Sequence, residues 1–348
     1  MYDGHTIAVV VPAYNEEGLV GDVVRTMPGF VDRIYVVDDA STDGTWAEIA
    51  QAASEVNERR GGTASETSWP NVVVPLSHER NRGVGGAIKT GYQEALDDGV
   101  DVVAVMGGDG QMPPGLLADV VRPVVEGRAD YAKGNRLATP NCRSEMPTFR
   151  YVGNHVLSYL TKIASGYWGA GDPQNGFTAV SADVLRAVDL EAFYEDYGYC
   201  NDILVRMNLA GVRVAEVPQP PTYGDEESDI TYSTYIPKVS AMLLRQFVWR
   251  IWDKYATRLH PVAISYVLAA VLFVAGTTSL LGSLAAGMTD GYNVPLAVLS
   301  VSVLACLLAM ALDREVNRPL SFVSSPGRSD EREFDPPEES DTGIQTDD

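Results

Sequence analysis

Four short apolar segments in the first half of the chain are each followed by a stretch with helical spacing. The apolar runs read HTIAVVVP, RIYVVDD, VVVPL and DVVAVM, and the helical stretches cover residues 16–27, 45–59, 84–96 and 116–126. Strands that alternate with helices predict an α/β domain with a parallel-rich central sheet. Because the runs are continuously apolar, we expect helices on both faces of this sheet. Ligands of such sheets bind beyond the carboxyl ends of the strands.

The pattern changes in the last third of the chain. Residues 235–260 place Val239, Leu243, Phe247 and Ile251 near helical spacing, with basic residues between them, which is typical of an amphipathic interfacial helix. Two segments without charged residues follow, Val262–Met288 and Val294–Leu312. A helix of about 20 residues crosses a bilayer, so both segments predict transmembrane helices. The alternative is a helical hairpin buried in a soluble core, which the aromatic residues just before the first segment disfavour.

The basic residues predict how these helices lie in the cell membrane. They precede the first span and, as Arg314 and Arg318, follow the second, whereas Asp290 lies in the connecting loop. The positive-inside rule therefore predicts that both termini and the α/β domain are cytoplasmic, with the basic helix on anionic lipid. The first residues, MYDGHTIAVVVP, lack a basic region followed by a long apolar run, so we expect no signal peptide.

Together these patterns predict four parts. They are an α/β domain at residues 1–234, the interfacial helix at 235–260, the two-helix hairpin at 261–313 and an acidic, disordered tail at 314–348. The formal net charge of the chain is −21, and it has few lysines, which indicates either a protein adapted to high salt or acidity concentrated in the tail. Such a surface repels nucleic acid, so we expect no nucleic-acid partner. The three cysteines have no spacing that indicates a disulfide framework or a zinc site.

Polar residues follow the first two predicted strands. VVVPAYNEE presents Pro12, Tyr14 and Glu16 at the carboxyl edge of the sheet, although an Asn15 that caps the next helix explains part of this motif equally well. VVDDASTDGT places Asp38 and Asp39 side by side at the same edge. Two adjacent carboxylates can accept hydrogen bonds from a nucleoside base and ribose hydroxyls. A turn with capping residues is the competing interpretation.

Glycine-rich motifs follow the third and fourth predicted strands. NRGVGGAIKTGY allows close backbone approach and places Lys89 in the first turns of a helix, where the motif can bind phosphate, but its spacing is not that of a Walker A loop. VAVMGGDGQMPP places Asp109 and Gln111 in a sharply turning loop. Their oxygens, together with water and substrate phosphate, suit Mg²⁺ or Mn²⁺. An ordinary turn at Asp109-Gly110 is the alternative.

These four motifs, in this order, resemble those of the family-two inverting glycosyltransferases, which include dolichyl-phosphate mannosyl- and glucosyltransferases. KGNR, RYVGNHVLSYLTKIASGYW, DPQNGF and YGYCND extend the resemblance over roughly residues 6 to 240. It implies a GT-A-type nucleotide-diphospho-sugar transferase fold. It also implies roles for individual residues: the nucleoside is held by Pro12, Tyr14, Glu16 and Asp39, with Lys89 beside it, and the metal by Asp109 and Gln111.

Residues in the later motifs are candidates for the sugar and the acceptor. Asp172 and Gln174 of DPQNGF can hydrogen-bond sugar hydroxyls, or Asp172 caps a turn. Arg136 and Arg150 suit bidentate contact with an acceptor phosphate, or they form salt bridges with the many carboxylates. Asp202 is a candidate general base for a sugar-hydroxyl acceptor, whereas a phosphate acceptor is already ionised and needs no base.

The sequence departs from the family pattern at two positions. Gly107 stands where the metal loop of the family commonly has the first residue of Asp-x-Asp, so metal affinity is expected to be weaker or to need another ligand. Asn201-Asp202 replaces the Glu-Asp of sugar-adding relatives.

The resemblance implies a membrane enzyme that transfers a hexose, with inversion, from a nucleotide-diphosphate sugar to dolichyl or polyprenyl phosphate. We expect UDP-glucose or another UDP-hexose as the donor and a role in N-glycosylation of surface proteins. Three alternatives stay open: a GDP-mannose-dependent mannosyltransferase, a transferase that extends a lipid-linked glycan with Asp202 as base, and a nucleotide-sugar-binding membrane scaffold without activity.

Overall fold

The computed structural model describes residues 1–61, 69–138, 148–220, 232–286 and 291–323. Its centre is a single sheet with the strand order β3-β2-β1-β4-β6-β5-β7-β8. The strands are β1 (Ile7–Ala13), β2 (Arg33–Asp38), β3 (Val73–Ser77), β4 (Val102–Val105), β5 (Tyr131–Asn135), β6 (Thr178–Ser181), β7 (Val214–Pro218) and β8 (Ser321–Val323). Among these described strands, only β6 is antiparallel to its neighbours. The predicted parallel-rich α/β sheet is confirmed.

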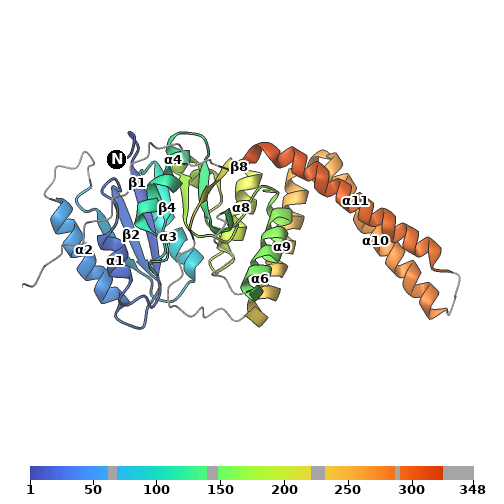
Figure 1. Cartoon of the computed structure of the whole chain (residues 1–348), viewed down its shortest axis with the longest axis horizontal. Coiled ribbons are helices and arrows are strands. Elements are labelled where there is room, and N and C mark those ends of the chain that lie inside the picture. Colours follow the sequence, from blue (N-terminus) through green and yellow to red (C-terminus); the bar gives the residue numbers. More distant parts are fainter. Residues whose placement is uncertain (62–68, 139–147, 221–231, 287–290, 324–348) are drawn as a thin grey trace, which may run out of the picture.

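Helices cover both faces of the sheet (Figure 1). One layer contains α1 (Val20–Arg25), α2 (Thr45–Gly61) and α4 (Leu117–Val125), and the other contains α3 (Val84–Asp97), α7 (Ala182–Ala187) and α8 (Tyr199–Leu209). Alternate residues of β1 serve the two layers: Val9 packs with the first, and Val10 with the second. Because side chains of a strand point alternately to opposite faces, both faces need apolar residues, which explains the continuous apolar runs.

The spacing predicted a helix from residue 16, but helix α1 begins at Val20. Asn15 and Gly18 have positive φ angles of 56° and 86°, which interrupt a right-handed helix. The backbone amide of Gly18 donates instead to the Glu48 carboxylate on α2. Asn15 is not a helix cap, since its side-chain oxygen accepts from the amide of Thr42. These partners are distant in sequence, so the local pattern did not reveal them.

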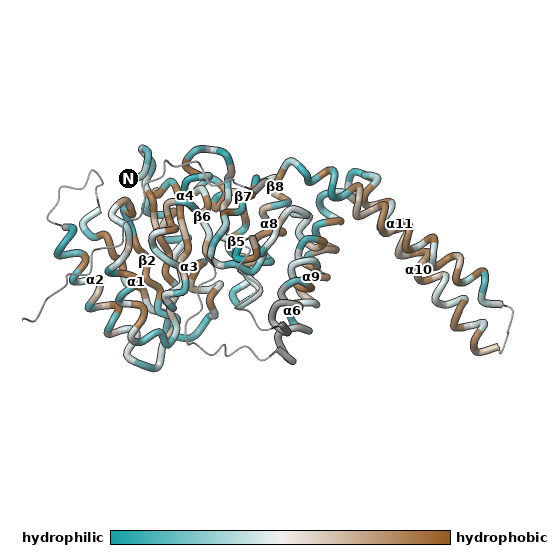
Figure 2. Tube along the Cα trace, viewed as in Figure 1, coloured by the Kyte–Doolittle hydropathy of each residue, from teal (hydrophilic) through white to brown (hydrophobic). Residues whose placement is uncertain are grey.

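The C-terminal part consists of the long helices α9 (Tyr232–Lys254), α10 (Pro261–Ala285) and α11 (Asn293–Asn317). Helix α6 (Thr148–Ser165) of the α/β domain packs against α9. Helices α10 and α11 pair as a hairpin that projects from the α/β domain (Figure 1). Apolar or neutral residues predominate along it (Figure 2). Both helices are long and apolar enough to cross a membrane, and most of their apolar window is exposed, unlike that of a soluble core helix. They are candidate membrane spans.

The apolar stripe of the predicted interfacial helix packs on protein. Val239 and Leu243 of α9 are buried in a cluster with Ala164 of α6. The exposed side of α9 carries Leu244 and Trp252, which are 65% and 68% exposed. Val239 and Leu243 therefore attach α9 to α6, and Ile251 packs with the start of α10, while a second set of apolar residues is exposed.

A buried polar network joins the hairpin to the α/β domain. We call it the membrane junction, and it consists of Arg250, Lys254, Tyr255, Asp313 and Asn317. Arg250 was expected among the basic residues that attract anionic lipid, but it is fully buried and pairs with Asp313 at 2.9 Å. A lone sequence pattern gives no sign of this pairing, because the two residues are on different helices.

The predicted tail begins too early. Residues 314–317 continue α11, and β8 at Ser321–Val323 adds a strand to β7 in parallel. Buried Asn317 donates to the hydroxyl of Tyr255, which keeps the end of α11 next to the domain. Residues 324–348 of the predicted tail lie outside the described residues. The chain therefore returns from the hairpin to the central sheet.

Candidate active site

The first, second and fourth motifs meet at one edge of the sheet, as predicted. The amide of Asp39 donates to the carbonyl of Ala13 at 2.9 Å, which joins the ends of β2 and β1. The amide of Gly108 donates to the carbonyl of Pro12 at 3.1 Å, which joins the metal loop to β1. Parallel strands bring their carboxyl ends to the same edge, and these bonds hold the loops that follow them there.

The two adjacent carboxylates at this edge have different partners. Asp38 accepts hydrogen bonds from the amide of Ser41 and the hydroxyl of Ser77. Asp39 accepts from His78 at 2.6 Å and from the amide of Gly83 at 2.7 Å. Both carboxylates are 3% exposed. Asp39 therefore fixes the start of the glycine-rich loop after β3.

Two predicted nucleoside residues flank these carboxylates. Tyr14 is 45% exposed at the end of β1, where its ring can contact a ligand. Glu16 is half-buried, and its amide donates to the hydroxyl of Thr45 at 2.7 Å. His78 was not singled out from the sequence. Its place directly after β3, at the same sheet edge, was the available signal.

The glycine-rich loop holds a segment of the chain itself. A Cβ atom at Gly85 would lie 2.3 Å from the carbonyl oxygen of Tyr194, and one at Gly83 would lie 2.5 Å from that of Glu195. Lys89 is 5% exposed and donates to the carboxylate of Glu191 at 3.1 Å. The glycines therefore allow this backbone contact, and the role of Lys89 beside a nucleotide stays a prediction.

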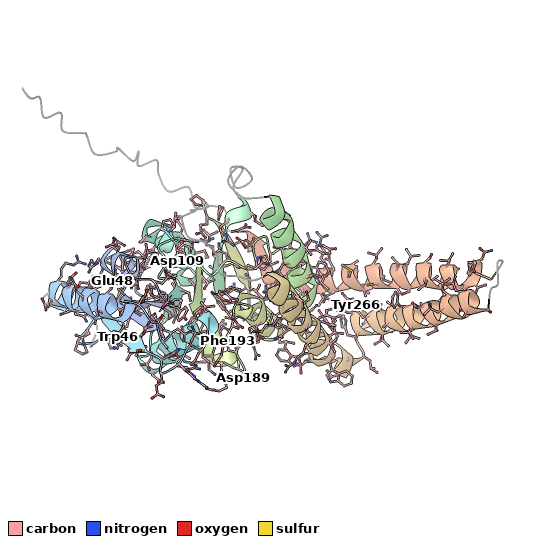
Figure 3. The ribbon with its side chains drawn as sticks, turned by 90° about the horizontal axis from the view of Figure 1, so that it is seen from below. Trp46, Glu48, Asp109, Asp189, Phe193 and Tyr266 are labelled. Atoms are coloured by element: carbon pink, nitrogen blue, oxygen red, sulfur yellow. The ribbon has the colours of Figure 1, made fainter. Side chains whose placement is uncertain are left out.

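The predicted metal loop follows β4 and contains one partly buried carboxylate. Asp109 accepts a hydrogen bond from the amide of Gln111 at 3.0 Å. Burial raises the pKa of Asp109, and the loop amides offset part of this rise. A Cβ at Gly107 would lie 2.8 Å from an oxygen of Asp109, so a side chain at position 107 would lie next to this carboxylate. Figure 3 shows the position of Asp109 in the α/β domain.

The donor set at this loop fits a hard divalent cation with few protein ligands. Within the described part of the chain, no group of three or more His, Cys, Asp or Glu residues is arranged to hold a metal ion. The carboxylate of Asp109 and the side-chain oxygen of Gln111 are ligands of the kind that Mg²⁺ and Mn²⁺ bind. Water and substrate phosphate normally complete the coordination shell of such ions. A cation here would therefore depend on its substrate.

Asp172 and Arg136, expected to bind different substrate groups, bind each other. Two guanidinium nitrogens of Arg136 donate to the two oxygens of Asp172 at 2.7 and 3.2 Å. Burial alone would raise the pKa of Asp172, but Arg136 and Lys133 outweigh it, and the net shift of that pKa is downward. The salt-bridge interpretation of Arg136 is thus observed, while its side chain stays 34% exposed.

The DPQNGF loop rests on a residue that the sequence did not reveal. Glu216 of β7 accepts hydrogen bonds from the amide of Gly171 at 2.6 Å and from the side chain of Asn135 at 2.7 Å. In the same loop the buried side-chain nitrogen of Gln174 has no hydrogen-bond partner among the described residues. Buried donors are nearly always paired, so an unpaired one next to a loop of this kind suits a ligand oxygen.

The remaining candidates lie on helices beyond the sheet edge. Asp202 on α8 is 1% exposed and accepts from the amide of Tyr194 at 3.0 Å, from Arg206 at 2.8 Å and from Gln246. Arg150 is on α6, but its side chain lies outside the described residues. The structure therefore brings together the candidates of the first, second and fourth motifs, whereas Lys89 of the third motif pairs with Glu191 and Asp202 lies in a separate contact with α9.

Comparison with known proteins identifies the family. The sequence profile of glycosyl transferase family 2 matches residues 8–189, slightly more than half of the chain. The chain belongs to glycosyl transferase family 2. It is therefore a glycosyltransferase, and the expectation of an enzyme is confirmed.

Two relatives of this glycosyltransferase act on lipid phosphates according to their names. A UDP-N-acetylglucosamine–dolichyl-phosphate N-acetylglucosaminyltransferase of Methanococcus voltae is 31% identical over 213 residues, covering 61% of this chain and 84% of the relative. An undecaprenyl-phosphate mannosyltransferase of Micrococcus luteus is 32% identical over 217 residues, covering 61% and 82%. The two relatives transfer different sugars.

The fold also has a counterpart among solved structures. A crystal structure described as a mycobacterial protein superposes with a TM-score of 0.51 at 20% identity, over 71% of this chain and 75% of that one. At this identity the likeness concerns the fold alone. The GT-A-like α/β fold that the sequence predicted is confirmed.

Proposed function

We propose that this glycosyltransferase moves one sugar, with inversion, from a nucleotide-diphosphate sugar to the phosphate of a dolichyl or polyprenyl lipid. The attachment of the catalytic sheet to two candidate membrane spans is the observation that carries the proposal. The buried membrane junction and the pairing of β8 with β7 attach the hairpin to the α/β domain at two places. The lipid-phosphate acceptors named for the two relatives support the same acceptor.

The donor is proposed to lie across the ends of β1, β2 and β4. Pro12 and Tyr14 would contact the nucleoside, and Asp38 and Asp39 would accept its hydrogen bonds. Asp109 and Gln111 would hold Mg²⁺ or Mn²⁺, which supplies positive charge for the diphosphate as it leaves. The raised pKa of Asp109 means that the carboxylate gains from a cation at this position.

The acceptor needs positioning and not deprotonation. A phosphomonoester is largely ionised near neutral pH, so its oxygen can attack the anomeric carbon directly from the face opposite the diphosphate. Arg136 is proposed to orient this phosphate while Asp172 holds the guanidinium in place through Nε and Nη2. The unpaired nitrogen of Gln174 supports a sugar hydroxyl at the DPQNGF loop.

The finer assignments are part of the same proposal. UDP-glucose or another UDP-hexose is favoured as the donor, with GDP-mannose as the alternative, and the product would supply N-glycosylation of surface proteins. The sheet edge and both chain ends would be cytoplasmic, because the basic residues flank the hairpin on that side. The acidic, lysine-poor composition supports assays at high salt.

The test is transfer of radiolabelled sugar by washed membranes that contain the protein. UDP-glucose, UDP-galactose, UDP-N-acetylglucosamine and GDP-mannose would each be offered with dolichyl phosphate, at high salt, with Mn²⁺ or a chelator. We expect metal-dependent labelling of the monophosphate lipid by one donor. Labelling only when a preformed glycolipid is supplied would contradict the phosphate acceptor, and nucleotide-sugar binding without any transfer would contradict the transfer itself.

A further inference from the structure

We call the sheet edge that is proposed to bind the nucleotide, with Asp38, Asp39 and Asp109, the nucleotide edge. One segment of the chain connects this edge to helix α9. We call residues 189–199 the bridge segment. Figure 3 shows two of its residues, Asp189 and Phe193, in the middle of the molecule, between Trp46 at one end and Tyr266 at the base of the hairpin. The match to the family profile ends at the first residue of this segment, and the YGYCND motif begins within it at Tyr197.

On one side the bridge segment binds the glycine-rich loop. The amide of Gly86 donates to the carbonyl of Glu195 at 3.0 Å, and the Arg82 guanidinium donates to the Glu195 carboxylate at 2.7 Å. Lys89 binds both the carbonyl and the carboxylate of Glu191. The amide of Arg82 in turn donates to Asp39. Arg82 thus contacts both the bridge segment and Asp39, a carboxylate that is proposed to bind the nucleoside.

On the other side it binds α8 and α9 through Asp202. One oxygen of this carboxylate accepts from the amide of Tyr194 and from Arg206, and the other accepts from Gln246 of α9. Arg206 also donates to the carbonyl of Ala192, so the same ion pair holds the segment twice. Three structural elements therefore meet at one side chain that is 1% exposed.

A general base and a positioning residue place different demands on this carboxylate. A base must reach the proton that it removes, whereas both oxygens of Asp202 already accept hydrogen bonds from the protein. A cavity of about 630 Å³ adjoins it, but Arg206 and Gln246, which line this cavity with it, are its own hydrogen-bond partners. The carboxylate is thus engaged on the side where a substrate could approach.

We propose that Asp202 is a positioning residue of the transfer reaction: it holds the bridge segment against α9 and thereby sets the geometry of the donor site. This inference rests on the proposed function for its substrates, but the contacts that carry it do not depend on the acceptor. Asp202 is the buried link between α9 and the bridge segment, and the exposed ion pair of Lys238 on α9 with Asp196 is a second link.

The substitution Asp202→Asn separates the two roles. The new amide keeps one oxygen for Tyr194 and Arg206. Its nitrogen can donate to the buried side-chain oxygen of Gln246, for which the described part of the chain supplies no partner. The geometry is therefore conserved while basicity is lost. Asp202→Ala removes all of these bonds. Asp183→Asn is the matched control, since it makes the same chemical change at a carboxylate that is 94% exposed.

We would measure kcat, donor KM and the pH profile of each variant, and the binding of UDP and GDP in the presence of Mn²⁺. We expect Asp202→Asn to retain kcat within about fivefold with an unaltered pH profile, because the proton acceptor is not needed. We expect Asp202→Ala to lose about 10²-fold in kcat/KM, mainly through a higher donor KM, because the donor site is displaced. The control should behave as the native protein does.

Other outcomes would overturn the proposal. A loss of about 10²-fold or more in kcat for Asp202→Asn, with donor KM unchanged and one limb of the pH profile removed, would make Asp202 the proton acceptor. A native donor KM and native nucleotide binding in Asp202→Ala would contradict the proposed role of Asp202 in positioning the donor site. If Asp202→Ala does not fold, Gln246→Ala, which removes only the α9 bond, takes its place: a raised donor KM supports the bridge, and a native KM contradicts it.

The acceptor hypothesis is tested separately in the same experiment. If the native protein labels no lipid phosphate, the proposed function fails, while nucleotide binding by the variants still decides whether Asp202 sets the donor site.

Discussion

The membrane junction and the nucleotide edge both contain charged groups between distant parts of the chain, but these groups differ in their hydrogen-bond partners. At the junction Arg250 donates to both oxygens of Asp313 and to the carbonyls of Ala164 and Ile163, and Tyr255 donates to Asp313 as well. At the edge Asp109 accepts from an amide of its own loop, and burial raises its pKa. A network whose members are all paired suits a structural role, whereas a partly buried carboxylate that is bonded to its own loop suits a ligand.

This difference predicts that breaking the junction affects stability most. Arg250→Met leaves the Asp313 carboxylate buried without its cation, and we expect a loss of about 3–5 kcal/mol in the free energy of unfolding. Thermal unfolding of the detergent-purified protein measures it. The double variant Arg250→Met/Asp313→Leu should recover part of the loss, because no unpaired charge remains. A loss below about 1 kcal/mol in the single variant would show that the pair is not structural.

At the edge the largest expected effect is on activity and not on stability. Asp109→Ala should lower kcat by about 10²–10³-fold, since a charge that stabilises the leaving group is lost. Its unfolding temperature should not fall, because the raised pKa shows that burial disfavours the ionised carboxylate. Calorimetry should detect weaker Mn²⁺ binding in the presence of UDP. Asp119→Asn, a change at a surface carboxylate, is the control.

The same carboxylate predicts a pH dependence. Mn²⁺ competes with a proton for Asp109, and the pKa of Asp109 is raised, so metal binding should weaken at a higher pH than for an ordinary aspartate as the solution is acidified. Titrations of Mn²⁺ at several pH values measure this. Binding that stays constant down to the pKa of an exposed carboxylate would show that another group holds the metal.

Asp172 is buried and paired, like the groups of the membrane junction, and its partner Arg136 is proposed to bind substrate, like the groups of the nucleotide edge. Its pKa is lowered in the folded protein, so its stabilising contribution is present above the unfolded pKa of about 4 and is lost as the pH falls through the lower folded pKa. Asp172→Asn should lower the free energy of unfolding by about 1.5–3 kcal/mol at neutral pH and reduce the acid dependence of stability. Melting curves between neutral and acidic pH test this. An equally steep acid dependence in the variant would assign it to other carboxylates.

The smallest expected change adds a group to the edge. Gly107→Asp supplies a second carboxylate next to Asp109, and we expect Mn²⁺ affinity to rise by on the order of tenfold, since affinity follows the number of charged ligands. The new Cβ would meet a side-chain oxygen of Asp109, which can rotate away. Gly107→Ala adds the same Cβ without the charge and is the matched control. Equal affinity in both variants would exclude a metal ligand at this position.

The candidate site could be predicted in part because its residues follow strands. Asp38, Asp39 and Asp109 are each at the end of an apolar run, and parallel strands bring such positions to one edge. The partners of those residues could not be predicted. Glu195 is more than a hundred residues from the loop that it contacts, and Glu216 is in a strand with no motif.

The sequence by itself determined the alternation of strands and helices, the order of the motifs, the family and the two candidate spans. Each of these depends on local hydrophobic periodicity or on neighbouring residues. The tertiary structure decided that Arg250 faces Asp313 and not lipid, that β8 joins β7, and that Asp202 connects α8 to α9. These are pairings between residues distant in the chain, and whether a charge is exposed or neutralised depends on which partner the fold brings to it.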